Sequence, residues 1–94
     1  MVGELKITKI SRPIKELKSK DFIFVNEKKM IVDSHYLFIA HKNTNEMIIE
    51  FFNPENNREY QLRYFDDQVE TSIEIYELQE EFQYVRREPK TISW

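Results

Sequence analysis

The chain has 94 residues, seven Phe, five Tyr, one Trp, a single glycine, no cysteine and a formal net charge of -3 at pH 7. The lack of cysteine excludes a disulfide framework, a thiolate zinc site and a cysteine nucleophile, and one glycine excludes a glycine-rich phosphate loop. A chain of this length buries roughly 60% of its unfolded surface, so we expect one small domain over residues 1–94. It has no apolar run approaching ~20 residues and no signal-peptide apolar segment, and we therefore expect a cytoplasmic protein.

The charge is unevenly distributed along the chain. Residues 1–47 carry nine Lys or Arg against six Asp or Glu, and residues 48–94 carry five against eleven. Two explanations stay open at this point: complementary charge on neighbouring strands, or a basic patch that binds a partner such as nucleic acid.

The N-terminal segment predicts an edge strand followed by a helical turn. In residues 1–10, apolar residues are mixed with lysines that would guard an open sheet edge. Pro13 ends this strand because it cannot donate to the ladder. Ile14 and Leu17 have the spacing of a single helical turn.

The central part of the chain predicts an antiparallel meander. Four runs rich in β-branched and aromatic residues, at 21–26, 29–39, 46–52 and 59–65, are separated by short polar turns. A shift in the apolar pattern predicts a bulge near Asp33 and Ser34, and residues 40–45 are expected to form an exposed loop. The inward positions expected from this pattern are Phe24, Val32, Ile49, Tyr60, Leu62 and Tyr64, with Gln61 pointing outward.

The final third of the chain is compatible with two structures. Val69, Ile73 and Tyr76 have helical spacing, whereas residues 72–87 also fit a strand with a bulge near Tyr76 and Glu77. We favour the strand, with Glu77, Glu80 and Glu81 on a solvated face. The expected fold is mainly β, a small antiparallel barrel of five to six strands with a short helical turn, a core within 21–87 and a tail at 88–94.

The layout resembles the N-terminal SH3-like (KOW-type) barrel domain of the elongation factor P family. The resemblance rests on residues 14–23, residues 28–33, the hairpin at 53–64, and Val69 and Glu70 with residues 81–85. It implies an SH3-like barrel associated with the translation or transcription machinery, with Lys42 near the family's modified lysine. The glycines that shape that hairpin tip are missing from residues 40–45, and the family's following domains are not represented, so the resemblance implies the fold rather than the activity.

Several groups of side chains are candidate sites. His35, His41 and Asp33 suggest a metal site, as does the acidic corner of Asp66, Asp67 and Glu70, but a hydrogen-bonded histidine and turn-forming carboxylates are the preferred interpretations. We therefore expect no metal and no cofactor. A third group, which would make a platform for stacking bases, consists of Tyr36, Phe38, Phe51, Phe52 and Tyr64.

The sequence contains no nucleophile–base arrangement, so we expect a binding module rather than an enzyme. Our first hypothesis is that this module contacts RNA, DNA or a nucleic-acid-handling complex through basic residues. The alternative is a protein–protein interaction or regulatory module, including a homodimer through an open strand edge. The candidate contact residues, drawn from a basic set that also includes Lys6 and Lys9, are Lys15, Lys18, Lys20, Lys28, Lys29, His41 and Lys42.

Overall fold

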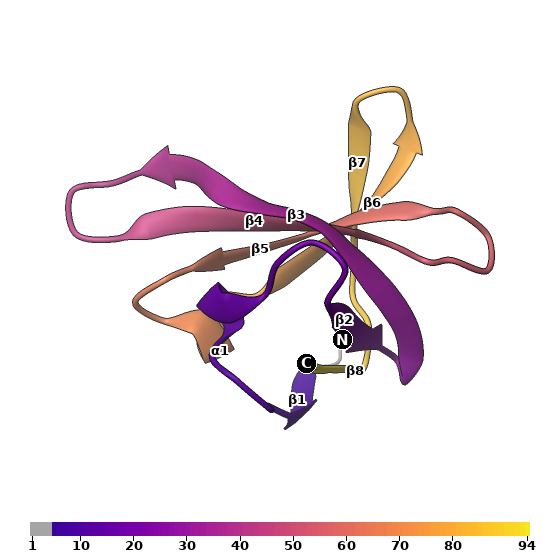
Figure 1. Cartoon of the computed structure of the whole chain (residues 1–94). Coiled ribbons are helices and arrows are strands. Elements are labelled where there is room, and N and C mark those ends of the chain that lie inside the picture. The colour runs from indigo at the N-terminus through magenta and orange to yellow at the C-terminus, as the bar shows by residue number, and fades with distance from the viewer. Residues whose placement is uncertain (1–4) are drawn as a thin grey trace.

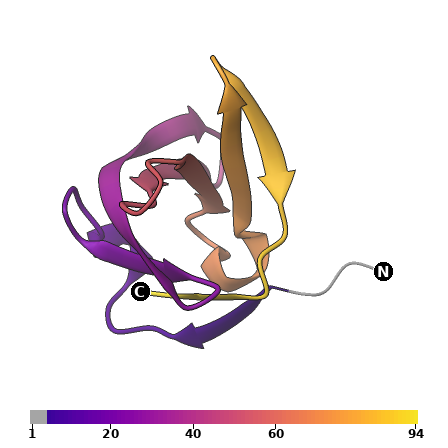
Figure 2. The same cartoon turned by 90° about the vertical axis from the view of Figure 1, so that its right-hand side faces the viewer.

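The structure is a computed structural model that describes residues 5–94. One sheet, in the order β1-β8-β2-β3-β4-β5-β6-β7, curls into a barrel-like shape (Figures 1 and 2). Its strands are β1 (Lys6–Lys9), β2 (Phe22–Val25), β3 (Lys28–Ala40), β4 (Asn45–Phe52), β5 (Glu59–Phe65), β6 (Glu74–Glu80), β7 (Gln83–Arg87) and β8 (Thr91–Ser93). The mainly β, barrel-like prediction is confirmed, with eight described strands where five to six were expected.

The N-terminal predictions are confirmed within the described residues. Strand β1 lies at one edge of the sheet, and residues 1–4 of the predicted edge strand lie outside the described part. A 3₁₀ turn, η1 (Ile14–Glu16), follows Pro13. Ile14 and Leu17 are both buried and belong to the core cluster, so the core begins before residue 21.

The β2–β3 hairpin turns without glycine because Asn26 and Glu27 adopt positive φ angles of 51° and 67°. Two central residues with φ > 0 define the turn that best matches the twist of paired strands. The Asn26 side chain also accepts hydrogen bonds from the backbone N–H groups of Lys90 (2.7 Å) and Thr91 (3.3 Å). This turn therefore also holds the beginning of β8.

Strand β3 contains the expected bulge. Val32 pairs with Phe51 and Ser34 with Glu50, so Asp33 is the extra residue. A second irregularity lies between Leu37 and Ile39. The two interruptions bend a thirteen-residue strand so that its first half lies in the barrel and its second half continues into a projecting hairpin with β4 (Figure 1).

The inward positions were mostly predicted correctly. Val32, Ile49, Leu62 and Tyr64 are each no more than 1% exposed, and Tyr60 is partly buried against the core. Phe24 is half-buried rather than buried, because Ile23 and Val25 are the β2 residues that belong to the core. Gln61 was expected to point into solvent, but other side chains cover it and leave it 5% exposed.

The final third forms strands, as favoured, but as a hairpin rather than as one bulged strand. Helical structure here is limited to α1 (Val69–Ser72). Strands β6 and β7 pair antiparallel, and the register shift lies between Leu78 and Glu80 instead of near Tyr76. Phe82, with a φ of 61°, supplies the turn conformation where the sequence has no glycine. The predicted bulge position was therefore wrong.

The predicted tail at 88–94 is also corrected, because it contains β8. This strand lies between β1 and β2, antiparallel to β2 and parallel to β1. Ile92 is 1% exposed and Trp94 is 5% exposed, and both belong to the core cluster. A strand of three residues is too short for alternation to reveal it, so only its neighbours show that it is part of the sheet.

Candidate interaction surface

The structure separates the predicted basic contact residues into two regions. Lys15 lies in η1, Lys18 and Lys20 precede β2, and Lys28 and Lys29 begin β3, whereas His41 and Lys42 lie in the β3–β4 loop. The β2–β3 turn and the β3–β4 tip are at opposite ends of β3 (Figure 1). All seven side chains are exposed. Their role in binding stays a prediction.

The segment that carries the first lysines has a fixed backbone. The Asp21 side chain accepts a hydrogen bond from the Lys18 backbone N–H at 2.9 Å and lies 3.4 Å from the Arg12 guanidinium. Lys20 has a φ of 78°, and its N–H donates to the carbonyl of Val32 at 2.8 Å. The backbone is thus held against β3 while the lysine side chains remain in solvent.

His35 links three parts of the fold. Its Nδ1 lies 2.7 Å from the carbonyl oxygen of Leu17, and its Nε2 lies 2.7 Å from the hydroxyl of Tyr64. A carbonyl oxygen only accepts, so Nδ1 carries the hydrogen and, in the neutral ring, Nε2 accepts from Tyr64. Burial, with a smaller contribution from Asp66, raises the pKa of Tyr64 to about 12, so this hydroxyl keeps its proton. The preferred interpretation of His35 as a hydrogen-bonded histidine is confirmed.

The acidic corner holds the hairpin tip in place. The Asp66 carboxylate accepts hydrogen bonds from the Asn45 N–H and side-chain amide, both at 3.0 Å, and from the Thr44 hydroxyl at 3.1 Å. The backbone hydrogen bond from Asn45 is the largest cause that lowers the pKa of Asp66. Within residues 5–94, no group of three or more His, Cys, Asp or Glu side chains is arranged to hold a metal ion.

Only part of the proposed stacking platform reaches the surface. Phe51 and Tyr64 are core residues with 1% exposure, which rules them out as stacking surfaces. Phe52 is half-buried. Tyr36 and Phe38 are exposed, at 39% and 46%.

Tyr36 and Phe38 belong to a larger cluster on the sheet face opposite the core. Register places Tyr36 across from Ile48, Ile48 across from Arg63, and Arg63 across from Glu74. Ile48 is 1% exposed although it lies outside the core cluster, so it is covered on this second face. We use the name aromatic face for Tyr36, Phe38, Arg63, Tyr76 and Tyr84.

Arg63 is held at the centre of the aromatic face. Its guanidinium carbon lies 4.1 Å from the ring centroid of Tyr76 and 5.4 Å from that of Phe38. Its Nε and Nη2 donate to the side-chain oxygen of Gln61 at 3.2 and 2.9 Å. Cation–π contact and two hydrogen bonds together fix a side chain that is otherwise flexible.

A carboxylate network lies beneath these rings. Glu50 accepts hydrogen bonds from the Ser34 hydroxyl at 3.0 Å and from the Gln61 amide at 3.1 Å. Burial is the largest cause that raises the pKa of Tyr36 and Tyr84, and the negative charge of Glu50 adds to it in both cases. Both phenols therefore stay neutral and able to donate hydrogen bonds at ordinary pH.

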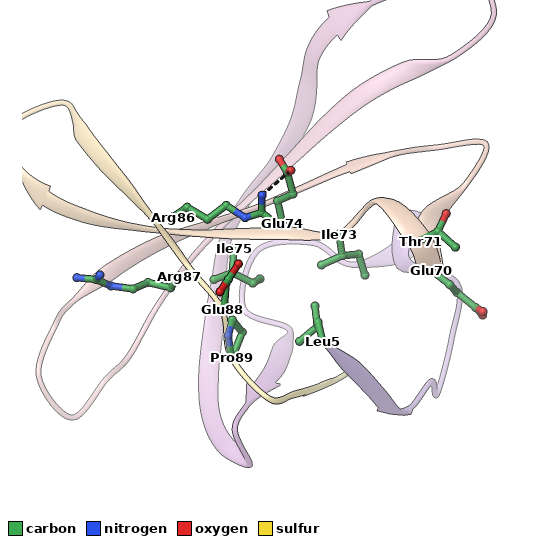
Figure 3. Close-up of a pocket in the computed structure, with 10 residues that line it drawn as sticks. All are labelled: Leu5, Glu70, Thr71, Ile73, Glu74, Ile75, Arg86, Arg87, Glu88 and Pro89. Carbon is green, nitrogen blue, oxygen red and sulfur yellow. Dashed lines mark ion pairs between the residues drawn. The ribbon is translucent and has the colours of Figure 1, made fainter. Parts of the chain in front are cut away.

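A groove of about 490 Å³ lies on another side of the molecule, between α1, β6 and the segment that leads to β8 (Figure 3). Leu5, Ile73, Ile75 and Pro89 supply its apolar lining. Arg86 and Arg87, which also line it, are paired, the first with Glu74 at 3.0 Å and the second with Glu77 at 2.9 Å. The groove therefore presents no unpaired arginine to an anionic ligand.

Glu77 is a correction to the sequence interpretation. It was expected on a solvated face with Glu80 and Glu81, but it is 7% exposed and binds Arg58 at 2.6 Å and Arg87 at 2.9 Å. It shares the parity of Ile75 on β6, which places it on the core side of the sheet.

Residues of the aromatic face beyond Tyr36 and Phe38 were missed from the sequence. Arg63 was assigned only to an outward position, and Tyr76 and Tyr84 were considered only as strand or helix residues. For Arg63 and Tyr76, the available signal was their outward parity, opposite to that of Leu62 and Ile75, because aromatic residues at outward positions are unusual on a fully solvated face. Strand pairing alone shows that β3, β5, β6 and β7 form one face, with β4 between β3 and β5.

No family model, curated protein or solved structure matches this chain. None of the helices in residues 5–94 has the length and apolar character needed to cross a membrane.

Proposed function

We propose that this protein is a protein–protein interaction module that binds its partner through the aromatic face and the adjoining part of β3. The observation that carries this proposal is a run of four large apolar residues that are all exposed, between 39% and 51%: Tyr36, Leu37, Phe38 and Ile39. Because side chains alternate along a strand, the run presents apolar surface on both faces of the projecting hairpin.

The chemistry of the aromatic face supports a protein partner. Tyrosine and arginine are enriched among the residues that contribute most to protein–protein binding. Arg63 is already ordered by Phe38, Tyr76 and Gln61, so binding would cost little side-chain entropy there. Glu50 and Glu74 adjoin the face, and such mixed charge suits a protein surface better than a row of phosphates.

A pair of truncations tests the proposal. The protein is immobilised, and the proteins it retains from extracts of its source cells are quantified for wild type, Tyr36→Ala/Phe38→Ala and the control Phe82→Ala. Phe82 is 87% exposed at the β6–β7 turn. We expect a specific partner to be retained by wild type and by the control and to be lost with the double variant. A partner set that is unchanged by the double variant would contradict the proposal.

Nucleic-acid binding is the second candidate function. The supporting observation is that Lys15, Lys18 and Lys20 are exposed within six residues of a fixed segment. Among the ion pairs of residues 5–94, none involves these three lysines. They would supply sequence-independent contacts to phosphates.

A further inference from the structure

The outer edge of β3 is covered only along its first part. Strand β2 pairs with β3 as far as Ile31, and the backbone of Val32 bonds to Lys20 and Asp21. From residue 33 to residue 40, the described backbone hydrogen bonds of β3 go to β4 alone. Eight residues of strand edge therefore face outward on the projecting hairpin (Figure 1).

This edge differs from the other two open edges of the sheet. Strand β1 carries Lys6 and Lys9, and β7 carries Arg86 and Arg87. Charged side chains on an edge strand oppose pairing with another chain. Residues 34–40 contain no Asp, Glu, Lys or Arg, so the β3 edge lacks that protection and is suited to strand addition.

The charges that flank the edge are complementary under a two-fold rotation. Asp33 and His41 lie four residues to either side of Leu37, and the positive charge at the second end is that of Lys42, which follows His41, whereas the His41 ring lies 3.9 Å from Glu46 of its own copy. If two β3 strands pair antiparallel about Leu37 in regular register, Asp33 of one copy faces His41 of the other. The irregularity near Phe38 shifts the register by one residue, so that Asp33 faces Lys42. A parallel pair would instead place Asp33 against Asp33.

We propose that a second copy of this chain pairs with the β3 edge, antiparallel and two-fold about Leu37, with Asp33 of each copy facing the His41–Lys42 end of the other. This proposal rests on the proposed function and names its partner. The pairing is isologous, so each contact occurs twice. Backbone hydrogen bonds supply the attraction, and the flanking charges set the direction.

The area involved predicts a weak dimer. A large side chain has ~200 Å² of surface, so residues 36–39, at 39–51% exposure, would bury at most about 350 Å² per copy. Stable interfaces bury about 800 Å² per partner. We therefore expect a reversible dimer whose population rises with concentration.

Sedimentation velocity from about 10 μM to about 1 mM tests the pairing. Leu37→Lys places two lysines face to face at the two-fold axis, and Phe82→Lys is the matched control at an exposed apolar residue away from the edge. We expect a concentration-dependent dimer for wild type and Phe82→Lys and a monomer for Leu37→Lys. A dimer that persists in folded Leu37→Lys, checked by circular dichroism, would overturn the proposal.

Charge reversal tests the direction of the strands. Asp33→Lys and Lys42→Asp each replace two attractive contacts by repulsive ones, and we expect either to weaken dimerisation by roughly tenfold. An equimolar mixture of the two variants should dimerise as wild type does, because each copy then meets opposite charge. A mixture no better than its components would exclude this antiparallel arrangement.

The outcomes separate this inference from the proposed function. A wild-type protein that stays monomeric to about 1 mM overturns self-pairing. If wild type then retains a protein other than itself, and Tyr36→Ala/Phe38→Ala does not retain that protein, the interaction function stands with another partner. If no protein depends on that surface and no dimer forms, both proposals fail.

Discussion

Single charged residues on this sheet differ according to the side chains that surround them. Arg63 lies on the outer face and is ordered by aromatic rings and Gln61, which makes it suitable as a binding anchor. Glu77 lies on the core side and is satisfied by Arg58 and Arg87. Both occupy strand positions with similar local sequence, so only their three-dimensional neighbours distinguish a surface role from a structural one.

Glu77 should make stability depend on pH. Burial raises its pKa, but hydrogen bonds from Arg87 and Arg58 and their positive charges outweigh this, so the folded-state pKa lies below its ordinary value. The stabilising contribution is therefore present above the unfolded pKa of about 4.3 and is lost as pH falls through the folded pKa. We expect Glu77→Gln to be less stable than wild type at pH 7 and to lose less stability on acidification.

Urea unfolding at neutral pH and at about pH 3 measures the stability that each protein loses on acidification, because these two pH values span the carboxylate titration. Glu80→Gln is the control, because Glu80 is exposed and belongs to none of the ion pairs in residues 5–94. If Glu77→Gln and wild type lost equal stability on acidification, the ion pairs of Glu77 would not be the source of the pH dependence.

At the scale of elements, short strands depend on their neighbours more than on their own sequence. Strand β8 has three residues and occupies an interior place in the sheet. It is held by Asn26 and by the chain before η1, where the Trp94 indole N–H donates to the carbonyl of Arg12 at 2.8 Å. Residues far apart in sequence thus close one side of the barrel, and β8 should contribute strongly to stability.

Trp94→Ala tests the place of β8. Trp94 is 5% exposed, and removal of a buried tryptophan typically costs about 3–5 kcal/mol, part of it from the lost partner of the Arg12 carbonyl. Urea unfolding should show this loss, whereas Phe82→Ala, at an aromatic residue in solvent, should change stability by less than about 0.5 kcal/mol. A similarly small effect for Trp94→Ala would mean that residues 88–94 are a tail after all.

At the scale of the whole molecule, the distribution of charge bears on the two candidate functions. The net charge of -3 opposes general affinity for polyanions. Lysines at the two ends of β3 are too far apart to act as one patch, because the thirteen residues of the strand separate the β2–β3 turn from the β3–β4 tip (Figure 1). Nucleic-acid binding would therefore depend on the local group of Lys15, Lys18 and Lys20.

A salt titration tests that group. If these lysines contact phosphates, fluorescence titration with mixed RNA and DNA oligonucleotides should show affinity that falls steeply with salt. Replacing all three by Ala should weaken binding to every sequence and reduce the salt slope by up to about one unit per lost contact, whereas Lys42→Ala, at the far end of β3, should have little effect. No binding at ~50 mM salt would remove nucleic acid as a direct partner.

The sequence by itself determined the parts of the fold that local physics specifies. Dense β-branched and aromatic runs separated by Asn- and Pro-containing turns predicted the strands from β2 to β5, and the break in pattern at Asp33 predicted the bulge, because side-chain alternation and turn preferences are short-range. The burial of Val32, Ile49 and Leu62 followed from the same alternation.

Only the tertiary structure decided the rest, because those features depend on which strands become neighbours. The place of β8 beside β1 and β2, the ion pairs of Glu77, and the assembly of Arg63 with Phe38 and Tyr76 join residues that are 10 to 85 positions apart. The open β3 edge has the same origin, since pairing with β2 ends at Ile31 while β3 continues to Ala40. Which edge stays open is a property of the whole sheet, and no local pattern encodes it.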